Sequence, residues 1–324
     1  MGTVVLSVDA ELGWGFHDFA EPPRDRLANA RRGWQTLLDL CEEYRVPATW
    51  AVVGHLFLDE CDGRHGDHPA PPGWFDHERG SDRMARSLRF ADGLIERTAT
   101  ADVDHEIGLH TFSHVEMGAS GTTARLADAE LSAAVDAARE WGVDPRPRSF
   151  VFPRNDVGNL QALADHGITC YRGTTPTDRR RFDRYGGVDR LVRAALGSAG
   201  PPLVEPRRDS LGLVDVPASL FLFSVEGILR SAAEPFVGDP VAVLARRGID
   251  RAAASDGLFH MWLHPNNLAG PQDAARLAEI FEHLARVRAR TDLEVRTMGD
   301  VAATVRDETE AASTAVVADG AEST

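Results

Sequence analysis

A pair of histidines four residues apart is the first feature of this sequence that could do chemistry. His110 and His114 stand in the segment DHEIGLHTFSHVEMG, which also carries the acids Glu106 and Glu116. Four residues is about one helical turn, so two imidazoles at this spacing can face the same space and bind one cation. The spacing alone is weak evidence in a chain with 12 histidines, because short motifs also match by chance. A metal site therefore needs further ligands elsewhere in the sequence.

Two acids, Asp9 and Glu11, follow the apolar run TVVLSV near the start of the chain. Residues i and i+2 of an extended strand share a face, so both carboxylates can reach one pocket. One carboxylate and two histidines form a ligand set that leaves positions open for water and substrate, as in catalytic zinc sites. If Glu11, His110 and His114 hold a metal, Asp9 is left as the general base. The alternative is that Glu11 is simply solvated in the following loop.

Two further residues would complete a hydrolytic site. Arg154, in the segment FPRN, would give Asp9 a bidentate counter-charge that orients the carboxylate and lowers its pKa. His264, in the segment WLHP, is the candidate general acid that protonates a leaving nitrogen. Simpler interpretations stay open at this point: Arg154 as a surface arginine, and His264 as a buried histidine bonded to the backbone.

Two tryptophans, Trp14 and Trp74, lie in expected loops, where an indole ring can stack on a sugar ring. Together with Asn155 of the FPRN segment they are the predicted substrate-binding residues, although a tryptophan more often belongs to the core. The sequence has no G-x-S-x-G elbow, no G-x-x-x-x-G-K-[ST] loop and no G-x-G-x-x-G turn at a strand–helix junction. Interpretations as a serine hydrolase, a P-loop protein or a dinucleotide-binding protein are therefore weak.

The chain is strongly acidic. It has 50 acidic residues against 35 basic ones, all of them arginine, and a net charge of -15. A lysine-free acidic chain is typical of a salt-loving organism, where salt screens the self-repulsion of the charge, so we expect a halophilic archaeal source. The charge also argues against nucleic acid as a partner, because phosphates bind to basic surfaces.

The cysteines and the start of the chain bear on location. Cys41, Cys61 and Cys170 are far apart and form no C-x-x-C pair, so we predict neither a disulfide framework nor a cysteine zinc site, and expect all three to be buried and inert. The chain begins MGTVVLSVDAELGWG, without the regions of a signal peptide, and no segment reaches the ~18 apolar residues of a membrane span. We therefore expect a soluble, cytoplasmic protein, with no prediction of its oligomeric state.

Apolar runs of strand length alternate with amphipathic stretches of helical length, a pattern that predicts an α/β protein with a parallel sheet. The expected helices cover residues 26–45, 124–141 and about 272–290, with a last one in MGDVAATV. The expected strands are TVVLSVDA, RVPATWAVVG, HEIGLHTF, RSFVFPRN, GITCYRG, LVDVPASLFLF, GLFHMWLHP and LEVR. The loop over residues 62–82 is long enough to form an active-site rim.

The candidate side chains share one position in this pattern: each follows a strand-like run. In a parallel barrel the carboxyl ends of the strands share one face, where catalytic groups collect, so we expect the acids, the histidines and Arg154 to meet in one pocket. Residues 1–305 are interpreted as one catalytic domain. Residues 306–324 are acidic and lack a periodic apolar face, which predicts a disordered tail.

Taken together, these segments resemble the polysaccharide deacetylase superfamily, carbohydrate esterase family 4. HTFSH carries that family's H-[ST]-x-x-H motif in full, and SVDAE is similar to the D-x-E form found in a divergent, intracellular branch. VPATWAVVG, FVFPRN and WLHP are similar to the second strand, the third motif and the last motif. The resemblance covers roughly residues 3–305 and implies a distorted (β/α) barrel of about seven parallel strands.

The resemblance also implies a function for each residue. Glu11, His110 and His114 would bind a divalent metal, Zn²⁺ in the first place, with Co²⁺, Mn²⁺ or Ni²⁺ as alternatives. Asp9 would be the base, Arg154 its orienting partner and His264 the acid. Together, these roles imply a metal-dependent amino-sugar deacetylase. Such an enzyme hydrolyses a non-peptide carbon–nitrogen bond and removes an N-acyl (acetyl) group from a glycan or glycan precursor.

Two alternatives to this function are kept. The divergent first motif also suits a hydrolase of a small cyclic amide or ureide, similar to an allantoinase. An inactive, glycan-binding homologue is the other alternative.

Overall fold

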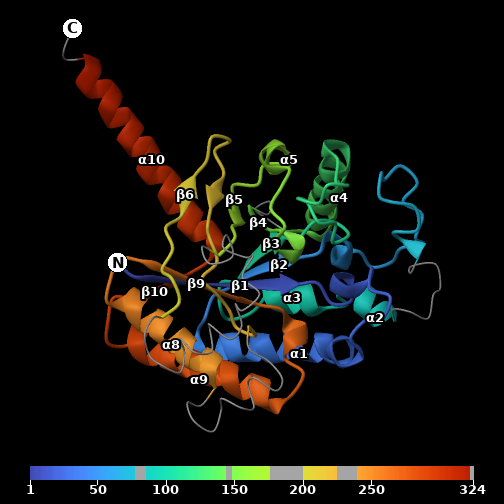
Figure 1. Cartoon of the computed structure of the whole chain (residues 1–324), viewed down its shortest axis with the longest axis horizontal. Coiled ribbons are helices and arrows are strands. Elements are labelled where there is room, and N and C mark those ends of the chain that lie inside the picture. Colours follow the sequence, from blue (N-terminus) through green and yellow to red (C-terminus); the bar gives the residue numbers. More distant parts are fainter. Residues whose placement is uncertain (77–84, 144–147, 176–199, 225–238, 322–324) are drawn as a thin grey trace.

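The computed structural model describes residues 1–76, 85–143, 148–175, 200–224 and 239–321, with no side chains placed for residues 312–321. The described strands join in one ten-stranded sheet in the order β6-β7-β5-β4-β3-β2-β1-β9-β8, and β10 pairs with the start of β1 (Figure 1). The strands are β1 (Thr3–Ala10), β2 (Thr49–Val52), β3 (Glu106–Leu109), β4 (Ser149–Val151), β5 (Cys170–Arg172), β6 (Arg207–Arg208), β7 (Val214–Asp215), β8 (Leu220–Phe221), β9 (Leu258–Leu263) and β10 (Glu294–Arg296).

The pairing of these strands is parallel except between β6 and β7, which confirms the predicted α/β class with a parallel sheet. The described strands outnumber the seven or so that the sequence suggested. One reason is that the run LVDVPASLFLF divides at Pro217 into β7 and β8. Another is the two-residue strand β6, which has no apolar pattern by which it could be predicted.

Helices lie on both sides of the sheet in Figure 1, with α1, α8 and α9 on one side and α4 and α5 on the other. The described α-helices are α1 (Arg24–Tyr44), α2 (Arg86–Arg89), α3 (Leu94–Ala99), α4 (Ala124–Trp141), α5 (Leu160–Asp165), α8 (Pro240–Ala253), α9 (Pro271–Arg288) and α10 (Met298–Ala321). Short 3₁₀ turns follow several strands: η1 (Trp14–Phe16), η2 (Gly54–Phe57), η4 (Pro153–Asn155) and η6 (Pro265–Asn267). The helices predicted over 26–45, 124–141 and 272–290 thus correspond to α1, α4 and α9.

Strand β1 divides its side chains between two environments. Val4, Leu6 and Val8 pack into the large apolar core that the strands share with the helices. The alternate residues point to the other face, where Ser7 and Asp9 bind the guanidinium of Arg172 on β5. Because side chains of a strand alternate between faces, one strand supplies both the core and the polar interior of the sheet.

The contact between β5 and β1 shows that the sheet is strongly curled. Three strands lie between them, so in a flat sheet they would be roughly 19 Å apart at the usual strand spacing. Instead, Arg172 Nη1 lies 2.5 Å from Asp9 Oδ1. The sheet therefore bends into a half-barrel, and the interior of the bend is where the polar side chains gather.

Helix α10 closes the amino-terminal end of this interior. Met298 and Val301 pack with Val5 of β1 and Val214 of β7, and the backbone N–H of Met298 donates to Thr49 Oγ1 at 2.8 Å. The interior is therefore filled with apolar side chains at the amino-terminal end of the strands, and its polar side chains gather toward the carboxyl end.

The same helix continues to Ala321 and extends away from the body (Figure 1). The segment after residue 306 is rich in alanine and has no proline, a composition that is compatible with a helix. That residues 306–324 form a disordered tail stays a prediction. That residues 1–305 form the catalytic domain stays a prediction. Within the described part of the chain, no helix is both long and apolar enough to cross a membrane.

Gly33 gives a test of how α1 packs against the turn that follows His264. A Cβ at this position of α1 would lie 2.0 Å from the carbonyl oxygen of Pro265, in the turn after His264. We expect Gly33→Ala to lower the free energy of unfolding by about 1–3 kcal/mol through overpacking. An exposed helical glycine would show the opposite sign, since alanine has the higher helix propensity.

Urea unfolding of the two proteins at one salt concentration measures this difference. Gly121→Ala is the matched control, because a Cβ there meets nothing within 4 Å. A Gly33→Ala protein as stable as the native one would contradict the packing described here.

Candidate active site

Two buried acids stand at the carboxyl end of β1. Asp9 is the penultimate residue of the strand, and Glu11 follows in a turn where Leu12 has a left-handed backbone, with φ of 45°. Their side chains are almost fully buried, with residue exposures of 2% and 4%. Two carboxylates at this depth need counter-charges or ligands, because an unpaired buried charge is very costly.

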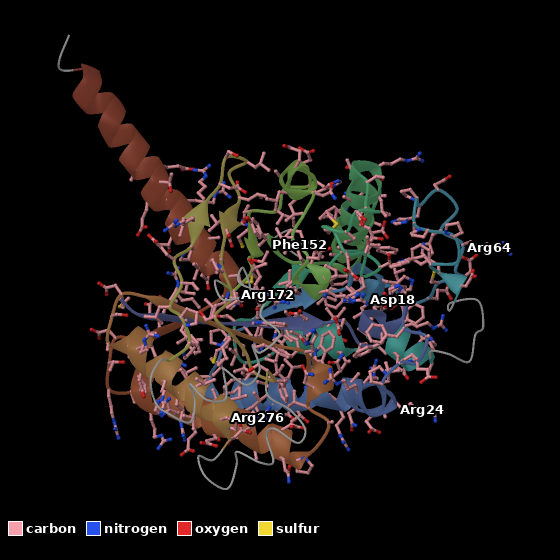
Figure 2. All side chains as sticks on the ribbon, viewed as in Figure 1. Asp18, Arg24, Arg64, Phe152, Arg172 and Arg276 are labelled. Carbon is pink, nitrogen blue, oxygen red and sulfur yellow. The ribbon has the colours of Figure 1, made fainter. Side chains whose placement is uncertain are left out.

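Arg172 is the counter-charge of Asp9. Its Nη1 and Nη2 lie 2.5 and 2.7 Å from the two oxygens of Asp9, and its side chain lies in the interior of the molecule (Figure 2). Nη1 also donates to Ser7 Oγ and Nη2 to Asn155 Oδ1. Burial raises the pKa of Asp9, but the charge of Arg172 and, next, of His264 outweigh it, so the pKa lies below its ordinary value.

The predicted pairing of Arg154 with Asp9 is wrong. Arg154 lies in η4 with a left-handed backbone, φ of 54°, which turns its side chain toward Asp18 and Glu116. Its Nη2 is 2.7 Å from Asp18 Oδ1, and its Nη1 is 2.5 Å from Glu116 Oε1. Arg154 remains at the entrance of the pocket, but the guanidinium that orients the base comes from β5.

Glu11 meets both histidines of the HTFSH segment. Its Oε2 lies 3.1 Å from His114 Nε2 and 3.7 Å from His110 Nε2. The Glu11 carboxylate also accepts a hydrogen bond from Asn266 Nδ2 at 3.1 Å. Burial opposes its ionisation, but the charge of His264 and the adjacent imidazoles of His110 and His114 prevail and hold the pKa of Glu11 well below its ordinary range.

The two histidines are brought together by a loop and not by a helical turn. His110 follows β3 directly, and the chain then reverses through Thr111 and His114, whose φ values are 56° and 64°. Glu130 of α4 secures this loop, because its carboxylate accepts the backbone N–H groups of Phe112 and Ser113. The ring centroids of the two histidines end up 5.1 Å apart.

The arrangement of Glu11, His110 and His114 fits a divalent cation. One ligand atom from each lies within 4.8 Å of the others. His110 Nδ1 donates to the carbonyl oxygen of Val151 at 2.8 Å, which fixes the tautomer and leaves a lone pair on Nε2. That Nε2 is buried and has no hydrogen-bond partner, as expected of a metal-ligand atom. A carboxylate and two imidazoles suit zinc and leave open positions.

His264 directly follows β9 and lies beside the two acids. Its Nδ1 lies 3.2 Å from Asn267 Oδ1, an acceptor, so the Nδ1–H donates and Nε2 is directed to the acids. Nε2 lies 3.6 Å from Asp9 Oδ2 and 3.9 Å from Glu11 Oε1. His264 can therefore exchange a proton with a group bound between the two acids.

Asp9, Glu11, His114 and His264 line a pocket of about 230 Å³ whose apolar walls are Phe16 and Trp262. Trp262 stacks on Phe221 with ring centroids 4.3 Å apart, and the Arg172 guanidinium lies over the Trp262 ring at 4.3 Å. Trp262 was not among the predicted substrate-binding residues, and Asn266 was also missed. Since both flank His264 in MWLHPNN, the segment itself could have suggested them.

The predicted substrate-binding residues have different places. Trp14 is fully buried, with its Nε1 bonded to the carbonyl of Arg89, so the prediction that it stacks on a sugar is wrong. Trp74 packs beside the histidine loop, where its Nε1 donates to Ser113 Oγ at 2.9 Å. Asn155 does line the pocket, and a substrate-binding role for it stays a prediction.

Comparison with known proteins shows what the chain is similar to. The polysaccharide deacetylase family model matches residues 22–171, which contain both histidines of the site but neither Asp9 nor His264. No curated protein matches the sequence. The structure resembles three solved structures below 25% identity, a range in which the likeness concerns the fold.

Two of these structures are proteins assigned as polysaccharide deacetylases. The one from Mycobacterium smegmatis is 20% identical with a TM-score of 0.59, covering 95% of this chain and 91% of its own. The one from Pseudomonas aeruginosa PAO1 is 13% identical with a TM-score of 0.56, covering 93% and 89%. The third, Puue allantoinase, is 14% identical with a TM-score of 0.55, covering 93% and 88%.

The Asp9–Arg172 pair can be tested by a double-mutant cycle. We expect Arg172→Gln to reduce the free energy of unfolding by about 3–5 kcal/mol, because it leaves a buried carboxylate uncompensated. In an Asp9→Asn background the same change should cost clearly less, since no charge is then stranded. Arg154→Gln is the control, and its half-exposed ion pairs should contribute about 0–1 kcal/mol. Equal losses in both backgrounds would refute a direct interaction.

His260 of β9 provides a test by pH. It is fully buried, with Nε2 2.9 Å from Ser7 Oγ, and burial, followed by the charge of Arg172, lowers its pKa to about 3. Between the ordinary His pKa of 6.5 and about 3, the unfolded chain binds a proton that the folded chain does not. Stability should therefore fall on acidification through this window, by at most about 1.4 kcal/mol per pH unit.

Unfolding titrations from pH 7 down to pH 4 at constant salt measure this slope. His260→Gln should flatten the profile relative to the native protein. A His260→Gln profile that runs parallel to the native one would show that this histidine is not held neutral.

Proposed function

We propose that this protein is a metal-dependent hydrolase of the polysaccharide deacetylase family that removes an N-acetyl group from an amino sugar of a glycan or glycan precursor. The observation that carries the proposal is the convergence, at one pocket, of an ionised acid, a three-ligand set with two histidines, and a third histidine, His264. The match of residues 22–171 to the family supports it. A cytoplasmic location stays a prediction.

Glu11, His110 and His114 would hold the cation, with Zn²⁺ as the first choice and Co²⁺, Mn²⁺ or Ni²⁺ as alternatives. When bound, a divalent cation supplies Lewis acidity at the floor of the pocket. The ligand residues are prepared for this: Glu11 is kept ionised, and burial lowers the pKa of His114, which favours the neutral imidazole that can coordinate.

Asp9 is the proposed general base. Arg172 holds both of its oxygens in a fixed plane and keeps it ionised. Its Oδ2 lies 3.6 Å from His264 Nε2, so a water that bridges these two atoms from the pocket side would be within hydrogen-bond reach of the carboxylate. Taking a proton from that water as it attacks an acyl carbon is the task of a general base.

His264 is the proposed general acid. Its Nδ1 is tied to Asn267, so the ring cannot turn away and Nε2 is the atom that exchanges protons. Delivery of a proton from Nε2 to the leaving nitrogen completes the cleavage of the amide and releases acetate and the free amine. Asp9 as the base and His264 as the acid account for the two proton transfers that amide hydrolysis requires.

The pocket limits the substrate to a small group. Its volume of about 230 Å³ is below the roughly 300–1,000 Å³ of pockets for drug-sized ligands, so it can admit one sugar ring with its acyl group. Phe16 and Trp262 offer apolar surface to the ring or the acyl methyl. The small volume also suits a cyclic ureide, which is therefore the second candidate substrate.

Acetate release from N-acetylated amino-sugar oligomers and from a nucleotide-linked N-acetyl sugar is the direct test. With the zinc-loaded protein at high salt, we expect turnover of at least one of them. Asp9→Asn should reduce kcat by about 10²–10⁴-fold, the usual contribution of a general base, while its zinc content stays unchanged. His110→Ala should lose turnover and one equivalent of zinc, the one that the pocket ligands would hold.

Arg139→Gln, an exposed change on α4, is the control that should behave like the native protein. Hydrolysis of allantoin without acetate release would replace the deacetylase by the ureide hydrolase. Full activity of Asp9→Asn would disprove the role of Asp9 in either reaction.

A further inference from the structure

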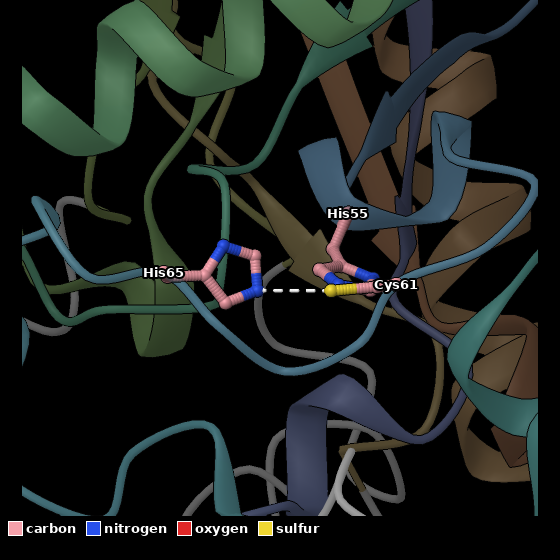
Figure 3. A group of neighbouring side chains, drawn as sticks. All are labelled: His55, Cys61 and His65. Carbon is pink, nitrogen blue, oxygen red and sulfur yellow. Dashed lines mark hydrogen bonds between the residues drawn. The ribbon is translucent and has the colours of Figure 1, made fainter.

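A second group of metal-ligating side chains lies outside the pocket and shares no residue with it. His55, Cys61 and His65 each offer one ligand atom, and the three atoms lie within 4.8 Å of one another. Figure 3 shows both imidazole rings beside the Cys61 sulfur. His65 Nε2 lies 3.1 Å from that sulfur. His55 is fully buried, and the other two are partly buried.

The backbone prepares each of these ligands. His55 is held in η2, and its Nδ1 lies 3.4 Å from the carbonyl oxygen of Arg89, which can only accept, so the lone pair is on Nε2. Cys61 and His65 are brought together by the turn CDGRH, where Gly63 has φ of 69°. The N–H of Gly63 points to Cys61 Sγ at 3.3 Å, a contact that favours a negatively charged sulfur.

Cys61 differs from the other two cysteines of the chain. Cys41 and Cys170 are buried, and burial raises the pKa of their thiols, which agrees with the expectation that they are inert. Cys61 is only partly buried, so the prediction that all three are buried is wrong for it. A thiol–imidazole hydrogen bond would explain Cys61 and His65 alone, but not the convergence of His55 on the same point.

We propose that His55, Cys61 and His65 bind one thiophilic divalent cation of the Zn²⁺ class. A thiolate and two imidazoles are the donors that select zinc over magnesium or calcium, and three of them leave the fourth tetrahedral position to water. On binding, the Cys61 S–H bond is broken, its proton passes to solvent and a sulfur–metal bond forms, with no change of oxidation state. This contradicts the expectation that the sequence has no cysteine zinc site.

Such a cation would fasten the loop after η2 to the body of the protein. The ring centroids of His65 and Phe75 lie 4.0 Å apart, and those of His55 and Trp14 lie 4.4 Å apart. Trp14 begins η1, whose last residue, Phe16, is a wall of the pocket. The second cation would therefore be structural. It would stabilise the residues that pack behind the pocket wall and would not contact the substrate.

Cobalt substitution tests the proposal, because only a cysteine ligand produces thiolate-to-Co²⁺ charge-transfer absorption in the near ultraviolet. The full-length protein, stripped of metal with a chelator, is titrated with Co²⁺ at high salt. We expect the absorption in the native protein and in Glu11→Gln, whose pocket site has no sulfur. Cys61→Ser should lose it, and His55→Gln and His65→Gln should weaken or abolish it.

Zinc content measured on the same proteins gives a second readout. Cys61→Ser should lose one equivalent relative to the native protein, and circular dichroism shows whether each variant is folded. No charge-transfer absorption in the folded native protein would overturn the proposal, and so would absorption that persists in Cys61→Ser or is unaffected by both histidine changes. None of these results depends on hydrolase activity, so failure of the proposed function is distinguishable.

Discussion

The buried ion pair between Asp9 and Arg172 is the interaction on which the rest of the site depends. A carboxylate at 2% exposure is tolerable only because a guanidinium binds both of its oxygens, since an unpaired charge at this depth costs several kcal/mol. The pair joins strands that three others separate, so it is formed only when the sheet is curled. The same contact thus depends on the curvature of the sheet and keeps the proposed base ionised.

The local pattern of the sequence was a good guide to the elements. The run TVVLSVDA is β1 residue for residue, and the helix expected over 124–141 is α4. These succeeded because alternation and helical periodicity are properties of neighbouring residues. The grouping of Glu11, His110 and His114 was also predicted, because parallel strands place their carboxyl ends on one side.

What the sequence did not reveal depends on contacts between distant strands. Arg172 stands in CYRG, at the end of a strand-like run, and a charged residue in a buried strand is a signal that a counter-charge must exist. Nothing local shows that the counter-charge is Asp9, because the distance closes only through the curl of the sheet. The motif around Arg154 predicts that it pairs with Asp9, but the left-handed backbone at its own position directs the side chain to Asp18.

The histidine loop shows how a site is fixed by polar groups that take no part in the chemistry. Glu130 has its pKa raised to about 7 by burial, although the bonds from Ser113 and Phe112 work in the other direction. Its carboxyl group replaces the water that the reversed backbone of the loop would otherwise need. The ligand set is therefore supported from behind by α4, at a distance from the substrate.

The position of β1 in the sheet has a consequence for the order in which the chain can fold. The first half of β1 lies between β9 and β10, whose residues come last in the body of the protein, and only its second half pairs with the early strand β2. The strand that carries Asp9 and leads directly to Glu11 therefore pairs with a strand nearly 300 residues away in sequence. Such long-range closure is slow, so we expect the pairing of β1 with β9 and β10, which brings His264 to the two acids, to be a late step of folding.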